Sequence, residues 1–199
     1  GTSGAELTEG ATYGVGMVVV ARFDEDIPDR AAAERQLKVT TTPRVEGSWY
    51  WVNDRKAHWR PREYYPPGTQ VTVDAGIYGN DLGGGLYGRE DTRVSFRIGD
   101  SRVAVADDAT KQVSVYEDGV LIRTMPTSMG KDSTPTLNGV YIVADKHDKI
   151  IMDSSTYGVA VNSPDGYRTP VDYATRMSYS GIFFHSAPWS VWAQGNTNT

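Results

Sequence analysis

The chain has 199 residues and a net charge of −5, from 20 basic and 25 acidic side chains that are well mixed along it. Because no basic stripe could face phosphate groups, and no apolar run approaches the roughly 20 residues of a membrane helix, we expect neither a nucleic-acid partner nor a membrane span. The absence of cysteine excludes disulfides, thiolate metal sites and thiol catalysis by these residues themselves.

Short strand signals dominate the first half of the chain. Each run is β-branched or aromatic and is bounded by Pro, Gly, Asn or Asp. A short helix is expected over residues 27–36, where Asp29 can cap the first turn and a run of alanines favours helix. The pattern predicts a β-sandwich, with strands over residues 15–23, 36–41, 49–52, 69–74 and 92–98.

Three tryptophans, Trp49, Trp51 and Trp59, lie in this half. Because buried aromatic side chains dominate domain cores, we interpret them as core residues. A platform on which sugar rings stack is the functional alternative.

A second set of strand signals follows, over residues 102–106, 112–116, 120–123, 139–143 and 149–152. Asp118-Gly119 predicts a tight hairpin between two of them, because these residues supply the positive φ values of a type I′ turn. We place a boundary near Gly99-Asp100, where the first set of strands ends. The expected organisation is therefore two all-β domains, residues 1–99 and 100–199.

The histidines, His58, His147 and His185, are scattered without ligand spacing, so no metal site is expected. His185 follows an apolar segment and precedes a polar loop. An imidazole titrates near neutral pH, so it can take a proton from a nucleophile and return it to a leaving group. Judged on this pattern alone, a packed strand residue is the more common interpretation.

Three segments carry a resemblance to a known family: His185-Ser-Ala-Pro-Trp189, Ser128-Met-Gly-Lys131 and Ile151-Met-Asp-Ser-Ser-Thr-Tyr-Gly158. From about Ser101 to Thr199 the chain resembles the catalytic domain of bacterial L,D-transpeptidases, the YkuD-type cysteine enzymes of peptidoglycan cross-linking. The first half resembles the immunoglobulin-like domain that precedes this domain in many actinobacterial members, through Phe23–Arg30, Trp59–Pro61 and Tyr64–Gly68. The resemblance implies an immunoglobulin-like β-sandwich followed by a YkuD-type β-sandwich.

The resemblance also implies roles for individual residues. His185 matches the general base, and the carbonyl of Ser186 accepts a hydrogen bond from its other ring nitrogen, which fixes the tautomer. The residues expected to bind substrate, on a flap, the adjoining strand and the closing loop, are Met152, Tyr157, Tyr167, Ser180, Trp189 and Asn198. Half-buried strand aromatics are an equally good interpretation of Tyr157 and Tyr167, and an aromatic lid over the sheet end is one for Trp189.

The implied reaction forms 3→3 cross-links between peptidoglycan stem peptides through a cysteine acyl-enzyme. It uses no metal or organic cofactor, and carbapenem β-lactams inhibit it. In the family, the loop matching Gln194–Thr199 leads into a Ser-His-Gly-Cys motif that carries the nucleophile. These residues hold the loop but not the motif, so we expect an L,D-transpeptidase cut short before its thiol and inactive as it stands.

Two further expectations follow from the resemblance. The protein belongs to the cell envelope outside the cytoplasm, and its membrane contact is made only through a segment that these residues do not contain. The alternative to the enzyme is a non-catalytic cell-wall-binding or spacer protein that keeps the same sandwich folds.

Overall fold

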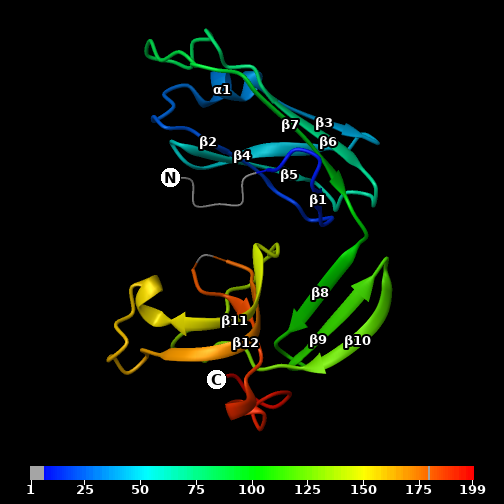
Figure 1. Cartoon of the computed structure of the whole chain (residues 1–199), viewed down its shortest axis with the longest axis vertical. Coiled ribbons are helices and arrows are strands. Elements are labelled where there is room, and N and C mark those ends of the chain that lie inside the picture. Colours follow the sequence, from blue (N-terminus) through cyan, green and yellow to red (C-terminus); the bar gives the residue numbers. More distant parts are fainter. Residues whose placement is uncertain (1–6, 179) are drawn as a thin grey trace. The chain divides into compact units, whose positions relative to one another are not determined.

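The computed structural model describes residues 7–178 and 180–199. The chain divides into two compact units, Gly1–Arg102 and Val103–Thr199 (Figure 1). Both are built mainly from strands, which confirms the expected all-β fold class. The division falls a few residues after Gly99-Asp100, and each unit is described by itself.

Two sheets form the first unit (Figure 1). One sheet has the strand order β1-β7-β6-β3 and the other has the order β2-β5-β4. Neighbouring strands are antiparallel except β1 and β7, which are parallel. The strands are β1 (Thr12–Tyr13), β2 (Val19–Arg22), β3 (Leu37–Thr42), β4 (Gly47–Asn53), β5 (Lys56–Pro61), β6 (Gln70–Ala75) and β7 (Thr92–Ile98).

Side chains from both sheets build the core of this unit. Val71 and Phe96 from one sheet are almost inaccessible to solvent, as is Val19 from the other. The Phe96 ring meets Tyr13 edge to face, with ring centroids 5.2 Å apart. Because the chain has no cysteine, apolar packing holds the two sheets together without a disulfide.

The helix α1 (Arg30–Gln36) begins as the sequence predicts. The Asp29 side chain accepts a hydrogen bond from the Ala32 amide at 3.0 Å and so caps the first turn. Ala33 is fully buried and packs in a cluster with Ile27 and Leu82. The alanine face therefore fixes the helix against the unit.

The tryptophans of this unit differ in burial. Trp59 is only 6% exposed, which confirms the core interpretation for this residue. Trp51 is half-buried, stacks on Phe23 with centroids 5.7 Å apart and donates its indole N–H to Glu34 at 2.7 Å. Trp49 is half-buried and lies opposite Trp59 across β4 and β5. Trp51 and Trp59 are therefore engaged in packing contacts within the unit.

The second unit also contains two sheets, with strand orders β10-β9-β8 and β11-β12-β13 (Figure 1). Asp118 and Gly119 have φ values of 46° and 80°, so the Asp-Gly hairpin between β9 and β10 is confirmed. Two short 3-10 helices are η1 (Ser154–Tyr157) and η2 (Pro188–Ser190). The strands are β8 (Arg102–Asp107), β9 (Gln112–Glu117), β10 (Val120–Pro126), β11 (Asp145–Asp153), β12 (Arg168–Arg176) and β13 (Phe183–Phe184).

The strand expected over residues 139–143 is wrong. This segment is irregular, and the Tyr141 hydroxyl donates to the Leu137 carbonyl at 2.7 Å. Its apolar composition is that of a strand, but no neighbouring strand pairs with it in the described part of the chain. Conversely, β5 and β12 were not expected. In β12, Pro170 and a positive φ of 55° at Tyr173 interrupt the strand pattern.

The closing segment of the chain is fastened to the exit of β10. The Gly195 amide donates to the Thr127 carbonyl at 2.8 Å, and the Thr199 amide donates to the Met129 carbonyl at 3.0 Å. The Ser128 hydroxyl donates to the Thr197 carbonyl at 2.8 Å. These bonds hold the tail, which turns over residues 191–196, beside residues 127–129.

Among the residues described, none of the helices is long and apolar enough to cross a membrane.

Candidate active site

The sheet β11-β12-β13 positions His185. Thr175 pairs with Phe184 and Arg176 with Phe183, so the short strand β13 is held along β12. Phe183 also packs against the buried cluster that includes Val171. The side chain of His185 therefore leaves a segment that is anchored by both backbone bonds and apolar packing.

The geometry of His185 selects one tautomer. Its Nδ1 lies 2.8 Å from the carbonyl oxygen of Ser186. A carbonyl oxygen can only accept a hydrogen bond, so Nδ1 carries the proton, and Nε2 of the neutral ring keeps its lone pair. The ring stacks on Trp189, with centroids 6.0 Å apart and planes at 24°. His185 is thus arranged as an oriented proton acceptor, which is the geometry a general base needs.

Ser186 acts through its backbone and its hydroxyl in different ways. The carbonyl holds the His185 ring. The amide and the hydroxyl both donate to the Asp172 carbonyl, at 3.2 and 3.0 Å. The hydroxyl therefore fastens the segment to β12, while the carbonyl orients the imidazole.

The flap is the segment over residues 152–167; Tyr157 is the last residue of η1 within it, and Tyr167 is its final residue. The loop closes at its base through buried Ser154, whose amide donates to the Tyr167 carbonyl at 3.0 Å and whose hydroxyl accepts from the Tyr167 amide at 2.9 Å. Burial raises the pKa of the Tyr167 phenol, and the nearby Tyr157 and Asp153 raise it further.

Sequence reasoning did not single out the residues that shape this flap. The Asp153 carboxylate accepts from the Ser155 amide at 2.9 Å and from its hydroxyl at 2.6 Å, capping η1. The Ser155 hydroxyl and amide, and then Arg168, lower the pKa of Asp153. The Asp-Ser-Ser-Thr run is a helix-start signal that could have indicated this cap.

The remaining expected residues differ in their accessibility. Met152 is 8% exposed and packs in the core cluster of the sheet. Ser180 is exposed, with its hydroxyl 2.9 Å from that of Ser178. Trp189 is 53% exposed. Both ends of the Asn198 amide are occupied, because its oxygen accepts from the Met129 amide at 3.1 Å and its nitrogen donates to Asp108 at 2.9 Å.

The structure therefore groups the expected residues into two sets. His185, Ser186 and Trp189 lie together by direct contact, and Tyr157 and Tyr167 both belong to the flap. Met152 and Asn198 have packing and fastening contacts instead. The assignment of all these residues to catalysis or substrate binding stays a prediction.

Ionic contacts around Asp165 and Asp145 were also not expected from the sequence. Lys131 lies 2.9 Å from Asp165 and so joins the segment after β10 to the flap. Asp145 lies 2.6 Å from His147 Nε2 and accepts from Arg176 Nε at 3.0 Å. In the described ranges, no group of three or more His, Cys, Asp or Glu residues could hold a metal ion.

Comparison with known proteins gives two family matches. Residues 2–81 match a bacterial Ig domain, and residues 101–199 match the L,D-transpeptidase catalytic domain. The sequence is 58% identical over 191 residues to L,D-transpeptidase 2 of Mycobacterium tuberculosis (strain CDC 1551 / Oshkosh), covering 96% of this chain and 47% of that protein. The chain thus spans about half the length of this relative.

Two further relatives are covered more completely. L,D-transpeptidase 1 of Mycobacterium tuberculosis (strain H37Rv) is 35% identical over 198 residues, which span this whole chain and 73% of the relative. The solved structure of the LD transpeptidase LdtMt1 in complex with imipenem matches with a TM-score of 0.83 and 35% identity, over 98% of this chain and 85% of that one. The chain belongs to the L,D-transpeptidase family, with an immunoglobulin-like domain before the catalytic domain.

Proposed function

We propose that this chain provides the general base and the substrate-binding flap of a peptidoglycan L,D-transpeptidase. The observation that carries the proposal is the His185–Ser186 contact, which leaves Nε2 of an oriented imidazole available as a proton acceptor. Family membership supplies the reaction for which such a base is used.

The proposed reaction has two acyl-transfer steps. A cysteine thiolate attacks the carbonyl between the third and fourth residues of a stem tetrapeptide, and the terminal D-alanine leaves with a proton from the imidazolium. The diaminopimelate amine of a second stem then attacks the thioester, gives its proton to the imidazole and releases the thiolate. The product is a 3→3 cross-link. These residues contain no cysteine, so the proposal takes the thiol from a Ser-His-Gly-Cys motif after the loop Gln194–Thr199.

Residues of this chain have separate tasks in the proposal. His185 moves the proton and the Ser186 carbonyl keeps its tautomer. Tyr157, Tyr167, Ser180 and Trp189 line the path of the stem peptide, because their side chains are exposed or half-buried. Met152 contributes through the core of the sheet, where it clusters with Val171 and Phe183 packs against that cluster, and Asn198 contributes through the position of the tail that it fastens.

The proposal extends to partners and location. A relative has been solved in complex with imipenem, so we propose that carbapenems acylate the complete enzyme as stem-peptide analogues. No cofactor is needed, because thiolate and imidazole supply the nucleophile and the proton transfer. Peptidoglycan stems are cross-linked outside the cytoplasm, and we therefore place the protein in the cell envelope.

The second candidate is a non-catalytic cell-wall-binding or spacer protein, which would use the same two domains for recognition alone. Such a protein would bind stem peptides or glycan without transferring an acyl group.

A chimera separates the two candidates. Residues 1–199 are followed by the corresponding C-terminal segment of L,D-transpeptidase 2 of Mycobacterium tuberculosis, and intact mass is measured after incubation with imipenem. We expect one covalent adduct on the chimera, and none on the 199-residue chain or on a chimera with the cysteine replaced by serine. A folded chimera that gains no mass and forms no cross-linked stem dimer would contradict the enzyme. An adduct on the 199-residue chain would reveal another nucleophile.

A further inference from the structure

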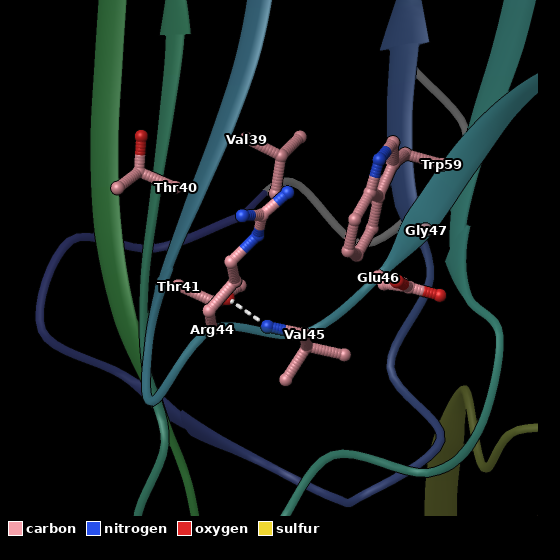
Figure 2. A pocket seen from close by; sticks show the side chains of 8 residues that line it. All are labelled: Val39, Thr40, Thr41, Arg44, Val45, Glu46, Gly47 and Trp59. Carbon is pink, nitrogen blue, oxygen red and sulfur yellow. Dashed lines mark hydrogen bonds between the residues drawn. The ribbon is translucent and has the colours of Figure 1, made fainter.

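A pocket of about 570 Å³ opens at one edge of the immunoglobulin-like unit, within the size range of small-ligand sites. It lies between β3 and β4, the outermost strands of the two described sheets. The connection between these strands crosses its end. Its lining is formed by Val39, Thr40, Thr41, Arg44, Val45, Glu46, Gly47 and Trp59 (Figure 2).

Arg44 brings an unused cation to this pocket. In Figure 2 its side chain rises from the connection, and its guanidinium lies beside Val39 and faces the Trp59 ring across the opening. Within residues 7–178 and 180–199, no hydrogen bond or ion pair engages this guanidinium. The Glu46 side chain points away in Figure 2 and pairs with Arg62 at 3.6 Å. Arg44 therefore keeps its five donors without a hydrogen-bonded acceptor among the described residues.

The surrounding residues hold the pocket in shape. The Val45 amide donates to the Thr41 hydroxyl at 2.6 Å, which fixes the turn that carries Arg44. A side chain at Gly47 would collide with the Trp59 indole, because a Cβ there would lie 2.1 Å from Cζ2. Glycine at this position lets the Trp59 indole pack closely against β4, where it forms one wall of the pocket.

These features specify the chemistry of a ligand. A free guanidinium binds a carboxylate through two parallel hydrogen bonds. Val39, Val45 and Trp59 form the apolar part of the lining beside it. A small apolar group next to a carboxylate fits both conditions.

We propose that this pocket binds the D-alanyl end of a peptidoglycan stem peptide, with Arg44 on the terminal carboxylate and the apolar walls around the methyl group. The source of the peptide rests on the proposed function, but the pocket is a separate, non-catalytic site. It gives the immunoglobulin-like unit a task of its own, namely holding a stem peptide of the cell wall.

The test is an NMR titration of the ¹⁵N-labelled 199-residue chain with the tetrapeptide L-Ala-γ-D-Glu-meso-diaminopimelate-D-Ala. We expect saturable shifts at residues 40–47 and at the Trp59 indole N–H, with a Kd of roughly 1 mM, as suits a single charged pair. Arg44→Gln should weaken these shifts at least tenfold, and Arg44→Lys should weaken them less. Arg89→Gln, at an exposed arginine of the same unit that does not line the pocket, is the matched control and should leave binding unchanged.

Each outcome has a defined meaning, because the spectrum also reports the flap and His185 separately. Shifts at the flap without shifts at residues 40–47 overturn this inference and leave the proposed function standing. Shifts at residues 40–47 alone support the pocket and contradict stem recognition at the candidate active site. Equal binding of the C-terminal amide, equal shifts with inorganic phosphate, or unchanged binding by Arg44→Gln would overturn the carboxylate assignment. The absence of shifts at both sites would overturn both proposals.

Discussion

The two units of this chain differ in how much of their apolar side chains is exposed to solvent. Among the described residues, the first unit holds most of the buried apolar side chains, with Val71, Phe96 and Ile98 at its centre. The second unit holds most of the exposed large ones, including the consecutive residues Val120, Leu121 and Ile122 of β10. The first unit therefore carries a core of its own, whereas in the second unit much apolar surface stays open to solvent.

Because of this difference, we expect the residues that determine stability and the residues that determine the chemistry to lie in different parts of the sequence. Substitutions in the immunoglobulin-like core should act on folding, because they remove buried contacts. Substitutions at the candidate active site should act on acyl transfer, because its side chains lie at the surface of the second unit. The predictions below test this separation, beginning with the largest effect.

Replacing His185 by Ala in the chimera should have the largest effect on chemistry. The change removes the proton acceptor, so the imipenem acylation rate should fall by about 10²–10⁴-fold. Stopped-flow acylation measures the rate, and thermal melts show whether the fold is kept. A folded variant that acylates at the parent rate would reduce His185 to a packed strand residue.

Ser186→Ala is the matched control for this experiment. It deletes the hydroxyl bond to Asp172 but keeps the carbonyl that orients the imidazole. We expect a much smaller fall in rate, together with a loss of stability of about 1 kcal/mol for one hydrogen bond.

Replacing Phe96 by Ala should have the largest effect on stability. Phe96 is 1% exposed and contacts Tyr13, so the free energy of unfolding of the first unit should fall by about 3–5 kcal/mol. Urea unfolding followed by resolved NMR peaks of each unit measures it. Leu121→Ala, at a position 52% exposed, should change stability by less than about 0.5 kcal/mol. A large loss there would mean that β10 is covered in solution.

Tyr65→Phe should stabilise the first unit. The Tyr65 side chain is 1% exposed, and its hydroxyl has no hydrogen-bond partner among the described residues. Removing that hydroxyl should raise the free energy of unfolding by about 1 kcal/mol. Burial also raises the pKa of the phenol above its ordinary value of 10.0. The parent should therefore lose stability as the pH rises above 10, because unfolding releases the proton, and the variant should not.

His58 should give the smallest effect, a loss of stability of the first unit in mild acid. Burial lowers the pKa of its imidazole from 6.5, and Lys56, Arg60 and Arg22 lower it further. The unfolded chain then binds the proton more readily, so stability is complete above pH 6.5 and declines as the pH falls through the folded pKa. His58→Gln should flatten the decline between pH 7 and 5 in urea titrations. An equal decline in the variant would assign it to other groups.

The sequence predicted local structure best where one residue type decides the conformation. Asp29 caps α1 and Asp118-Gly119 turns the β9–β10 hairpin, as their chemistry requires. It predicted worst where a strand depends on its neighbours. Residues 139–143 have strand composition but no partner strand in the described ranges, whereas β12 pairs on both sides in spite of Pro170.

The candidate site shows the same limit. The motif His185-Ser186 and the resemblance indicated which residues to examine, and the structure adds the 2.8 Å contact between them. The Asn198 amide and the Lys131–Asp165 pair depend on segments far apart in the sequence. No local pattern encodes such contacts, because each partner alone is an ordinary polar residue.

Gly181 sets a limit on how this protein can vary. Its φ of 101° suits glycine, and a Cβ there would lie 3.0 Å from the Tyr157 ring on the flap. Any other residue would strain the backbone, and its Cβ would force the Tyr157 ring to move by a few tenths of an ångström. Under the proposed function, a substitution at position 181 would therefore act on the substrate-binding flap and not on the proton-transfer group.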